Sequence, residues 1–338
     1  MKRQWKRGMA ICAVGAMLLS GLTGCEFAKS ESGDACRIVT TVFPTYDFAK
    51  EIACEDAEVT MLLSPGAESH AYEPTAMDLL KIQQCDVFVY IGGTSEIWVD
   101  KVLKTLDTSK VKVLRMFDVV DPLEEETVEG MEPEEHDHDH DHAEDSDAQD
   151  AHDEHDEHEE AEYDEHVWTS PANASKMAEA MHTAIASSDE KHKTEIDKRY
   201  ATLSESLKKL EQDCATLRET AASDTLIFGD RFPFRYLTQS LGLRYYAAFP
   251  GCSSETEPSA ATVSFLIQKV QDSEIPYVLY TESSTRKIAD RIAEATRAKT
   301  AMLHSCNNVT KAEMEANVTY VSLMQQNLDT LRTVLGTK

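Results

Sequence analysis

The sequence is short of positive charge: 33 Lys and Arg stand against 61 Asp and Glu, a formal net charge of −28 at pH 7. This balance argues against nucleic acid as a partner and favours cations. Two zinc signatures are also missing. Without C-x-x-C, a cysteine-ligated zinc site is not expected, and without H-E-x-x-H the sequence lacks the mark of a zinc peptidase. The one long apolar run, residues 9–22, is too short and too early for a conventional membrane-spanning helix.

That apolar run has the flanks of a secretory signal. Basic residues precede it, and the tetrapeptide LTGC at 22–25 follows it, with small residues before a cysteine. This pattern resembles bacterial lipoproteins and predicts cleavage before Cys25, a lipid on Cys25 and a short tether at 25–35. The mature chain is then extracytoplasmic and lipid-anchored to the cell membrane. An uncleaved anchor is the alternative.

Residues 134–166 contain eight of the twelve histidines among many carboxylates, and residues 116–175 carry 25 Asp and Glu with no Lys or Arg. Imidazole is the commonest ligand for zinc, copper and nickel, whereas unbalanced negative charge prevents a packed core. We therefore predict a disordered loop at 124–163 that gathers metal ions. An acidic, solubilising loop with incidental histidines is the alternative. The accessory metal-binding residues of this loop are His136, His138, His140, His142, His152, His155 and His158.

Eight cysteines occur, of which Cys12 lies in the signal and Cys25 at the lipid site. Outside the cytoplasm the others can form disulfides. Sequence alone leaves fifteen pairings of six thiols. These six are Cys36, Cys54, Cys85, Cys214, Cys252 and Cys306.

Short apolar strands alternate with helices, which predicts an α/β fold with parallel sheets. The 314 residues after the signal favour two domains, and the same alternation occurs twice, so we expect two α/β lobes. The predicted strands are 38–42, 59–63, 87–91, 225–228, 243–248, 277–280 and 300–303, and the helices are 44–53, 75–83, 233–241, 259–272, 285–297 and 317–334.

The segment between the lobes reads as helical. Ser170-Pro171 is a helix start, and apolar residues at alternating steps of four and three predict a second helix from 189 to about 221. Such a helix would be roughly 50 Å long, enough to join both lobes. We expect an N-terminal lobe at 36–170, a helical linker at 171–222 and a C-terminal lobe at 223–338. A separate helical hairpin domain is the alternative.

Ligands of open α/β sheets bind beyond the carboxyl ends of the strands, and four loops of this sequence meet that condition. They carry His70 after strand 59–63, His166 at the end of the acidic run, Asp230 after strand 225–228 and His304 after strand 300–303. Each histidine alone is more often a surface or hydrogen-bonded residue. Together they indicate a metal site.

Five segments resemble a known family, the metal-binding lipoproteins of ABC importers for zinc and manganese, and its zinc branch in particular. The segments are IVTTVFPTYD (38–47), GAESHAYEP (66–74), VYIGG (89–93), HVWTSP (166–171) and ETEPS (255–259). The resemblance covers most of the chain after the signal. It implies two α/β lobes joined by a long rigid helix, with a metal site in the interlobe cleft and a histidine- and acid-rich loop before the second ligand.

The resemblance also implies the ligands. His70 matches the first family histidine, His166 the second, and His304 the fourth position. The third falls on Gly229, which has no side chain; Asp230 beside it either supplies an oxygen or pairs with Arg231 and Arg235. Three histidines and an oxygen or a water suit zinc, whereas carboxylate-rich sets favour manganese.

Two further expectations come from the same resemblance. Glu282 matches a family glutamate near the cleft, where it orients a ligand imidazole; a helix-capping role is the alternative. Some zinc-uptake members bridge the loops that carry Cys252 and Cys306, which makes these two cysteines a possible disulfide.

The expected function is capture and delivery without catalysis: a monomer binds Zn²⁺, its transported ligand, and docks on the permease of an ABC importer. Because neutral imidazole is the ligand, metal should be lost below about pH 6. The alternatives are a binding protein for manganese or another divalent metal, a zinc-dependent hydrolase with an activated water, and an adhesin stabilised by its metal.

Overall fold

The first half of the chain forms a four-stranded parallel sheet in the order β2-β1-β3-β4. All four residues of β3 are buried, as in a central strand covered on both faces. This computed structural model describes residues 35–107, 109–131, 162–253, 257–273 and 275–338. The strands of the sheet are β1 (Arg37–Thr40), β2 (Glu58–Met61), β3 (Val87–Tyr90) and β4 (Lys112–Arg115).

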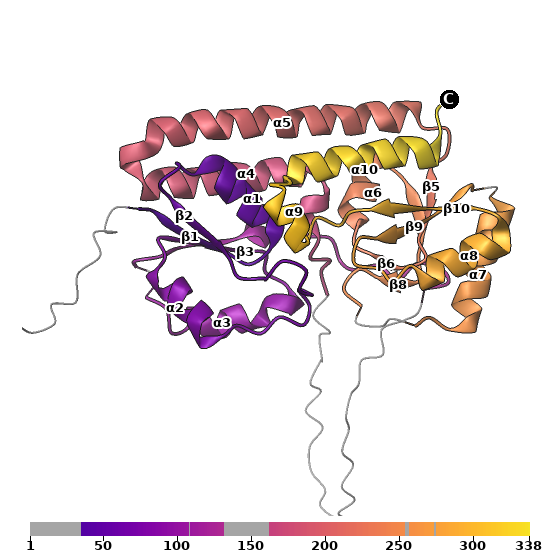
Figure 1. The fold of residues 1–338 in the computed structure, drawn as a ribbon, viewed down its shortest axis with the longest axis horizontal. Coiled ribbons are helices and arrows are strands. Elements are labelled where there is room, and N and C mark those ends of the chain that lie inside the picture. Colours follow the sequence, from indigo (N-terminus) through magenta and orange to yellow (C-terminus); the bar gives the residue numbers. More distant parts are fainter. Residues whose placement is uncertain (1–34, 108, 132–161, 254–256, 274) are drawn as a thin grey trace, which may run out of the picture. The chain divides into compact units, whose positions relative to one another are not determined.

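Helices cover both faces of this sheet (Figure 1). On one face, Ile82 of α2 and Val99 of α3 pack with Phe88 of β3; on the other, α1 and α4 pack against Val87 and Val89. The sequence did not predict α3 or β4, which are short and lack a sustained apolar period. The helical elements here are α1 (Phe43–Ile52), α2 (Ala76–Gln84), η1 (Thr94–Glu96), α3 (Ile97–Leu103) and η2 (Met116–Asp118).

The second half has parallel strand pairs in place of one long sheet: β9 with β10, β5 with β7, and β6 with β8. A parallel bridge between Phe228 and Leu279 links the first two pairs. The elements are β5 (Thr225–Ile227), β6 (Arg231–Phe232), α6 (Arg235–Leu241), β7 (Arg244–Tyr246), β8 (Phe249–Pro250), α7 (Ala260–Asp272), β9 (Tyr277–Thr281), α8 (Lys287–Thr296), β10 (Lys299–Leu303), α9 (Lys311–Glu315) and α10 (Tyr320–Leu335).

Between the halves lie η3 (Val167–Thr169), α4 (Pro171–Ser188), η4 (Glu190–His192) and α5 (Lys193–Thr220). Helix α5 has 28 residues, about 42 Å at 1.5 Å per residue, and runs along α4 and α1 of the first half and α10 of the second (Figure 1). It begins four residues later than predicted, because Asp189 ends α4 and η4 intervenes. The predicted stripe is its buried face, with Tyr200 only partly buried.

Residues 36–338 form one compact unit, in which a single core cluster runs from the first sheet through α4, α5 and α10 to the second half. The expectation of two α/β lobes with parallel sheets and a long helix is confirmed. The finer limits at 36–170, 171–222 and 223–338 remain a prediction. Among the described helices, none has both the length and the apolarity needed to span a bilayer.

The predicted disorder over 124–163 is wrong at both ends. Glu124 and Tyr163 form an antiparallel bridge, and the Leu123 N–H donates to the hydroxyl of Tyr236 over 2.9 Å. Met131 is buried in the main core. These apolar and aromatic anchors hold the ends of the segment despite its charge. Cys25 and the seven accessory histidines lie outside the described residues.

Asp47 of α1 is a buried carboxyl that holds the start of α10. Its Oδ2 accepts the backbone N–H of Tyr320 over 2.8 Å. Burial raises the pKa of Asp47 from 3.8 to about 7, although the Tyr320 hydrogen bond acts in the opposite direction. When the pKa of a carboxyl is higher in the folded chain than in the unfolded chain, the protonated form of that carboxyl favours the folded state. This stabilisation is complete below about pH 4 and is lost as the pH rises through about 7.

The variant Asp47→Asn removes this titration and keeps an oxygen acceptor for Tyr320. Between about pH 4 and pH 8, we expect the free energy of unfolding of the wild type to fall relative to the variant by roughly 4 kcal/mol. Urea unfolding at the two pH values measures the change. Asp329→Asn, an exposed position on α10, is the matched control and should follow the wild type. Parallel pH profiles for wild type and Asp47→Asn would contradict the assignment.

Candidate metal centre

His70 lies in the loop between β2 and α2, where one side of its ring is hydrogen-bonded and lies near a carboxylate. Nδ1 is 2.6 Å from Ser95 Oγ and 4.0 Å from Glu165 Oε2. Burial and the neighbouring His166 lower the pKa of His70, which favours the neutral ring. With Nδ1 donating to Ser95, the lone pair of Nε2 is free to bind a cation.

His166 enters the site from the start of η3, with its ring centroid 5.8 Å from that of His70. The side chain is 3 % exposed, and Nδ1 is 3.2 Å from Asp164 Oδ1, which also accepts the His166 backbone N–H over 2.8 Å. Burial acts to lower the pKa of His166, but the Asp164 carboxylate outweighs it and the pKa rises. A carboxylate on Nδ1 fixes the tautomer that offers Nε2 to a metal.

Glu165 is the acidic residue of this site and was not predicted. Its Oε1 accepts the Ser95 N–H over 2.6 Å and the Thr94 hydroxyl over 3.0 Å, which places Oε2 near His70. A Cβ on Gly93 would lie 2.5 Å from Oε1, so only glycine leaves room for this carboxylate. Gly93, the last residue of the segment VYIGG, therefore has a steric role at the site.

Cys252 reaches the site after β8. The preceding Gly251 passes so close to His166 that a Cβ there would lie 3.3 Å from the ring carbon Cε1. The Cys252 N–H donates to Glu125 Oε1 over 3.0 Å. Donor atoms of His70, Glu165 and Cys252 all lie within 4.8 Å of one another, a separation at which one ion can bind all three.

The expected disulfide between Cys252 and Cys306 is not formed, because both are free thiols. Their loops hold them against different partners: Cys252 lies beside Glu165, whereas Cys306 is buried beside His304 and donates its N–H to His304 Nδ1 over 2.9 Å. Burial and the charge of Glu125 raise the pKa of Cys252 well above its ordinary value. A metal bound here has to displace the thiol proton.

His304 does not join His70. Its Nδ1 accepts the Cys306 N–H, so a neutral ring carries its proton on Nε2, which is buried without a hydrogen-bond partner and lies 3.7 Å from Glu313 Oε1. In the part of the chain that the structure describes, the group of three clustered metal donors at this site is His70, Glu165 and Cys252, and it includes neither His304 nor His166. In this arrangement Nε2 offers a proton and not a lone pair.

Asp230 also has another partner. Its Oδ2 accepts both the N–H and the hydroxyl of Thr281, over 2.9 and 2.6 Å. Arg231 lies against Glu68, and Arg235 pairs with Glu126. Asp230 therefore fixes the end of β9, and the two arginines expected to pair with it contact other acids; its role as a metal ligand stays a prediction.

Glu282 lies 3.8 Å from His304 Nδ1, close to the position expected of an orienting carboxylate. The Glu282 carboxylate accepts two hydrogen bonds from Ser305, one from its backbone N–H over 2.8 Å and one from its hydroxyl over 2.5 Å. The carboxylate thus holds the loop after β10 and orients His304 only through that loop.

The structure places His70 and His166 in one pocket, as the sequence predicted, and it adds Glu165 and Cys252 as candidate donors. Glu165 directly precedes His166, and Cys252 follows β8, yet neither residue carries a local signature of a ligand. The histidines and Glu165 line one pocket together with Tyr72, Trp98 and Trp168. Nitrogen, oxygen and sulfur donors in one place suit zinc better than the harder manganese ion.

The family described as zinc-uptake complex component A, periplasmic (ZnuA), matches residues 38–334. The chain belongs to this family. The resemblance stated from the motifs is thereby confirmed.

Curated relatives of this ZnuA-family chain agree. It is 32% identical over 311 residues to the zinc-binding lipoprotein AdcA of Streptococcus pneumoniae strain R6, covering 92% of this chain and 58% of that protein. It is 28% identical over 340 residues, with full coverage of both chains, to the high-affinity zinc uptake system protein ZnuA of Bacillus subtilis. The chain spans a little over half the length of the streptococcal relative.

Solved structures show the same fold as this ZnuA-family chain. The Zn(II)-bound ZnuA-like domain of Streptococcus pneumoniae AdcA superposes with a TM-score of 0.69 at 29% identity, over 89% of this chain and 99% of that domain. The metal-dependent lipoprotein YcdH of Bacillus subtilis gives a TM-score of 0.71 at 26% identity, over 89% and 100%.

Proposed function

We propose that the chain is an extracytoplasmic zinc-binding protein that captures Zn²⁺ as cargo and delivers it to the permease of an ABC importer. One observation supports the proposal: the ring centroids of His70 and His166 lie 5.8 Å apart, and the Nδ1 atom of each ring lies within hydrogen-bonding distance of an oxygen atom, which leaves each Nε2 for a metal ion. Membership of the zinc-uptake family and relatives named for zinc binding support it.

The proposal includes the finer expectations from the sequence. The protein acts as a monomer without enzymatic activity and is anchored by lipid on Cys25, while the histidines of the acidic loop collect zinc for the deeper site. For the ligands we propose His70 and His166 with Cys252 and Glu165. Cys252 takes the place of the side chain that Gly229 lacks.

A competition titration tests both the metal and the ligand set. Against a chelator of known affinity, we expect the mature chain to show one tight zinc site and at least about tenfold weaker manganese binding, because manganese gains less from nitrogen and sulfur donors. Equal affinity for the two metals would contradict a zinc importer.

In the same titration, Cys252→Ser should weaken the tight zinc site by at least about tenfold, since a thiolate ligand is lost. His304→Ala should change it less than Cys252→Ser. Cys214→Ser, at a buried thiol on α5, is the matched control and should leave zinc affinity unchanged. If His304→Ala abolished tight binding and Cys252→Ser did not, the original three-histidine set would be right and Cys252 would be no ligand.

A further inference from the structure

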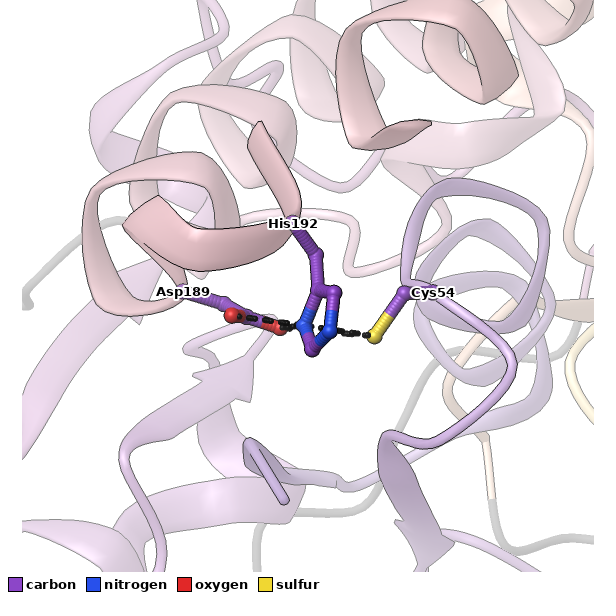
Figure 2. A group of neighbouring side chains, drawn as sticks. All are labelled: Cys54, Asp189 and His192. Atoms are coloured by element: carbon purple, nitrogen blue, oxygen red, sulfur yellow. Dashed lines mark hydrogen bonds and ion pairs between the residues drawn. The ribbon is translucent and has the colours of Figure 1, made fainter. Parts of the chain in front are cut away.

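A second cluster of metal-binding side chains lies away from the cargo pocket. Cys54 follows α1, Asp189 ends α4, and His192 belongs to η4 (Figure 2). Cys54 comes just before β2, whereas His70 comes after it, so the two groups lie toward opposite ends of the first sheet. The Cys54 and Asp189 residues are 6 % and 7 % exposed.

The three donor atoms converge on one point. Cys54 Sγ is 3.3 Å from Asp189 Oδ2 and 3.5 Å from His192 Nδ1, and Nδ1 is 2.9 Å from both carboxylate oxygens. Around a tetrahedral zinc ion, with bonds of about 2.3 Å to sulfur and 2.0–2.1 Å to nitrogen or oxygen, ligand atoms are about 3.3–3.6 Å apart. Only His192 Nδ1 and the Asp189 oxygens, which are 2.9 Å apart, would have to separate by a few tenths of an ångström.

The arrangement does not fit a catalytic thiol relay. In such a relay the base takes the nucleophile's proton at one ring nitrogen and is oriented through the other. Here Cys54 and Asp189 approach the same nitrogen of His192, Nδ1, as ligands of one ion would. The carboxylate, imidazole and thiol together form a mixed donor set of the kind that zinc accepts.

We propose that Cys54, Asp189 and His192 form a second site for a zinc-class divalent cation, which binds as the Cys54 thiol releases its proton to solvent. Three protein donors leave the fourth position to a water molecule. Because Cys54 is 135 residues from Asp189, the ion fastens the corner between α4 and α5 to the end of α1. The role is structural and separate from cargo transport.

Cobalt(II) is the probe for this site, because a thiolate bound to Co²⁺ gives a charge-transfer band in the near ultraviolet. The acidic loop at 132–161 contains no cysteine and gives no such band. The full mature chain carries Cys252→Ser, which removes the thiol proposed for the cargo site. We expect a thiolate band in this chain, its loss on adding Cys54→Ser, and its retention on adding Cys214→Ser as the matched control.

His192→Asn keeps the thiol and alters a partly exposed residue, so it covers the case in which Cys54→Ser fails to fold. In the Cys252→Ser chain it should weaken cobalt binding at the thiolate band by at least about tenfold, because an imidazole ligand is lost. Absence of the band in the Cys252→Ser chain, or a band that neither Cys54→Ser nor His192→Asn diminishes, would overturn the proposal. The tight cargo affinity for zinc should be the same with and without Cys54→Ser, so the two proposals fail separately.

Discussion

His70→Ala should raise the dissociation constant of the tight zinc site at least about 100-fold. The loss exceeds the 10- to 100-fold typical of removing a residue that only orients a ligand, because a direct nitrogen donor disappears. Ser95 holds the ring in place, so the wild-type site is arranged before the ion arrives. Competition against a chelator of known affinity measures the change.

The matched control is His182→Ala. His182 stacks on Tyr200 at 4.2 Å and bonds Asp197, on helices α4 and α5 and outside the pocket. The His182→Ala variant also removes one imidazole and should leave the zinc affinity of the tight site unchanged. Comparable losses in the two variants would mean that the tight site lies elsewhere in the chain.

Trp168→Ala should lower the free energy of unfolding by about 3–5 kcal/mol, the usual cost of emptying a large aromatic site in a core. Trp168 is 2 % exposed, and its Nε1 donates to Ser305 O over 2.8 Å. Its own carbonyl accepts the Tyr320 hydroxyl over 2.6 Å. Trp168 thus joins the loop that carries His166 to the loop after β10 through its indole, and to α10 through its backbone carbonyl.

Urea unfolding with an unchanged denaturant slope provides the measurement. Trp98→Ala is the control: Trp98 is only partly buried, on α3, and its loss should be clearly smaller. If Trp98→Ala cost as much as Trp168→Ala, the special position of Trp168 between the loops would not account for the effect.

Much of the fold was predictable because local patterns and tertiary packing agree. The stripe along α5 and the apolar strands gave the right elements in the right order. Helix boundaries differed from the prediction where a capping interaction sets the first residue. Thr319 and Ser322 form a capping box, so α10 starts at Tyr320 and not at 317. Short elements such as α3 and β4 have too few residues to show a period.

Candidate site residues could be predicted from the sequence only where the residue type itself indicates a metal ligand, as histidine does. His70 and His166, which line one pocket, were predicted from their loops, whereas the candidate donor Glu165 is one of many acids in its segment and the candidate donor Cys252 was assigned to a disulfide. Whether His304 can bind depends on which ring nitrogen is occupied, and the backbone N–H of Cys306 decides that. No sequence pattern reports such a contact. The group of Cys54, Asp189 and His192 is likewise assembled by folding alone.

Under the proposed function, the continuous core beneath α5 constrains how zinc can leave. This helix packs on α1 from the first half and on α6 and α10 from the second, and its apolar stripe belongs to one cluster that reaches both. Moving the two halves apart would expose that cluster to water, at a free-energy cost of about 25 cal/mol per Å² of apolar surface. Ion exchange should therefore depend on local rearrangement of the loops after β2, β8 and β10, with the two halves remaining packed on the common core.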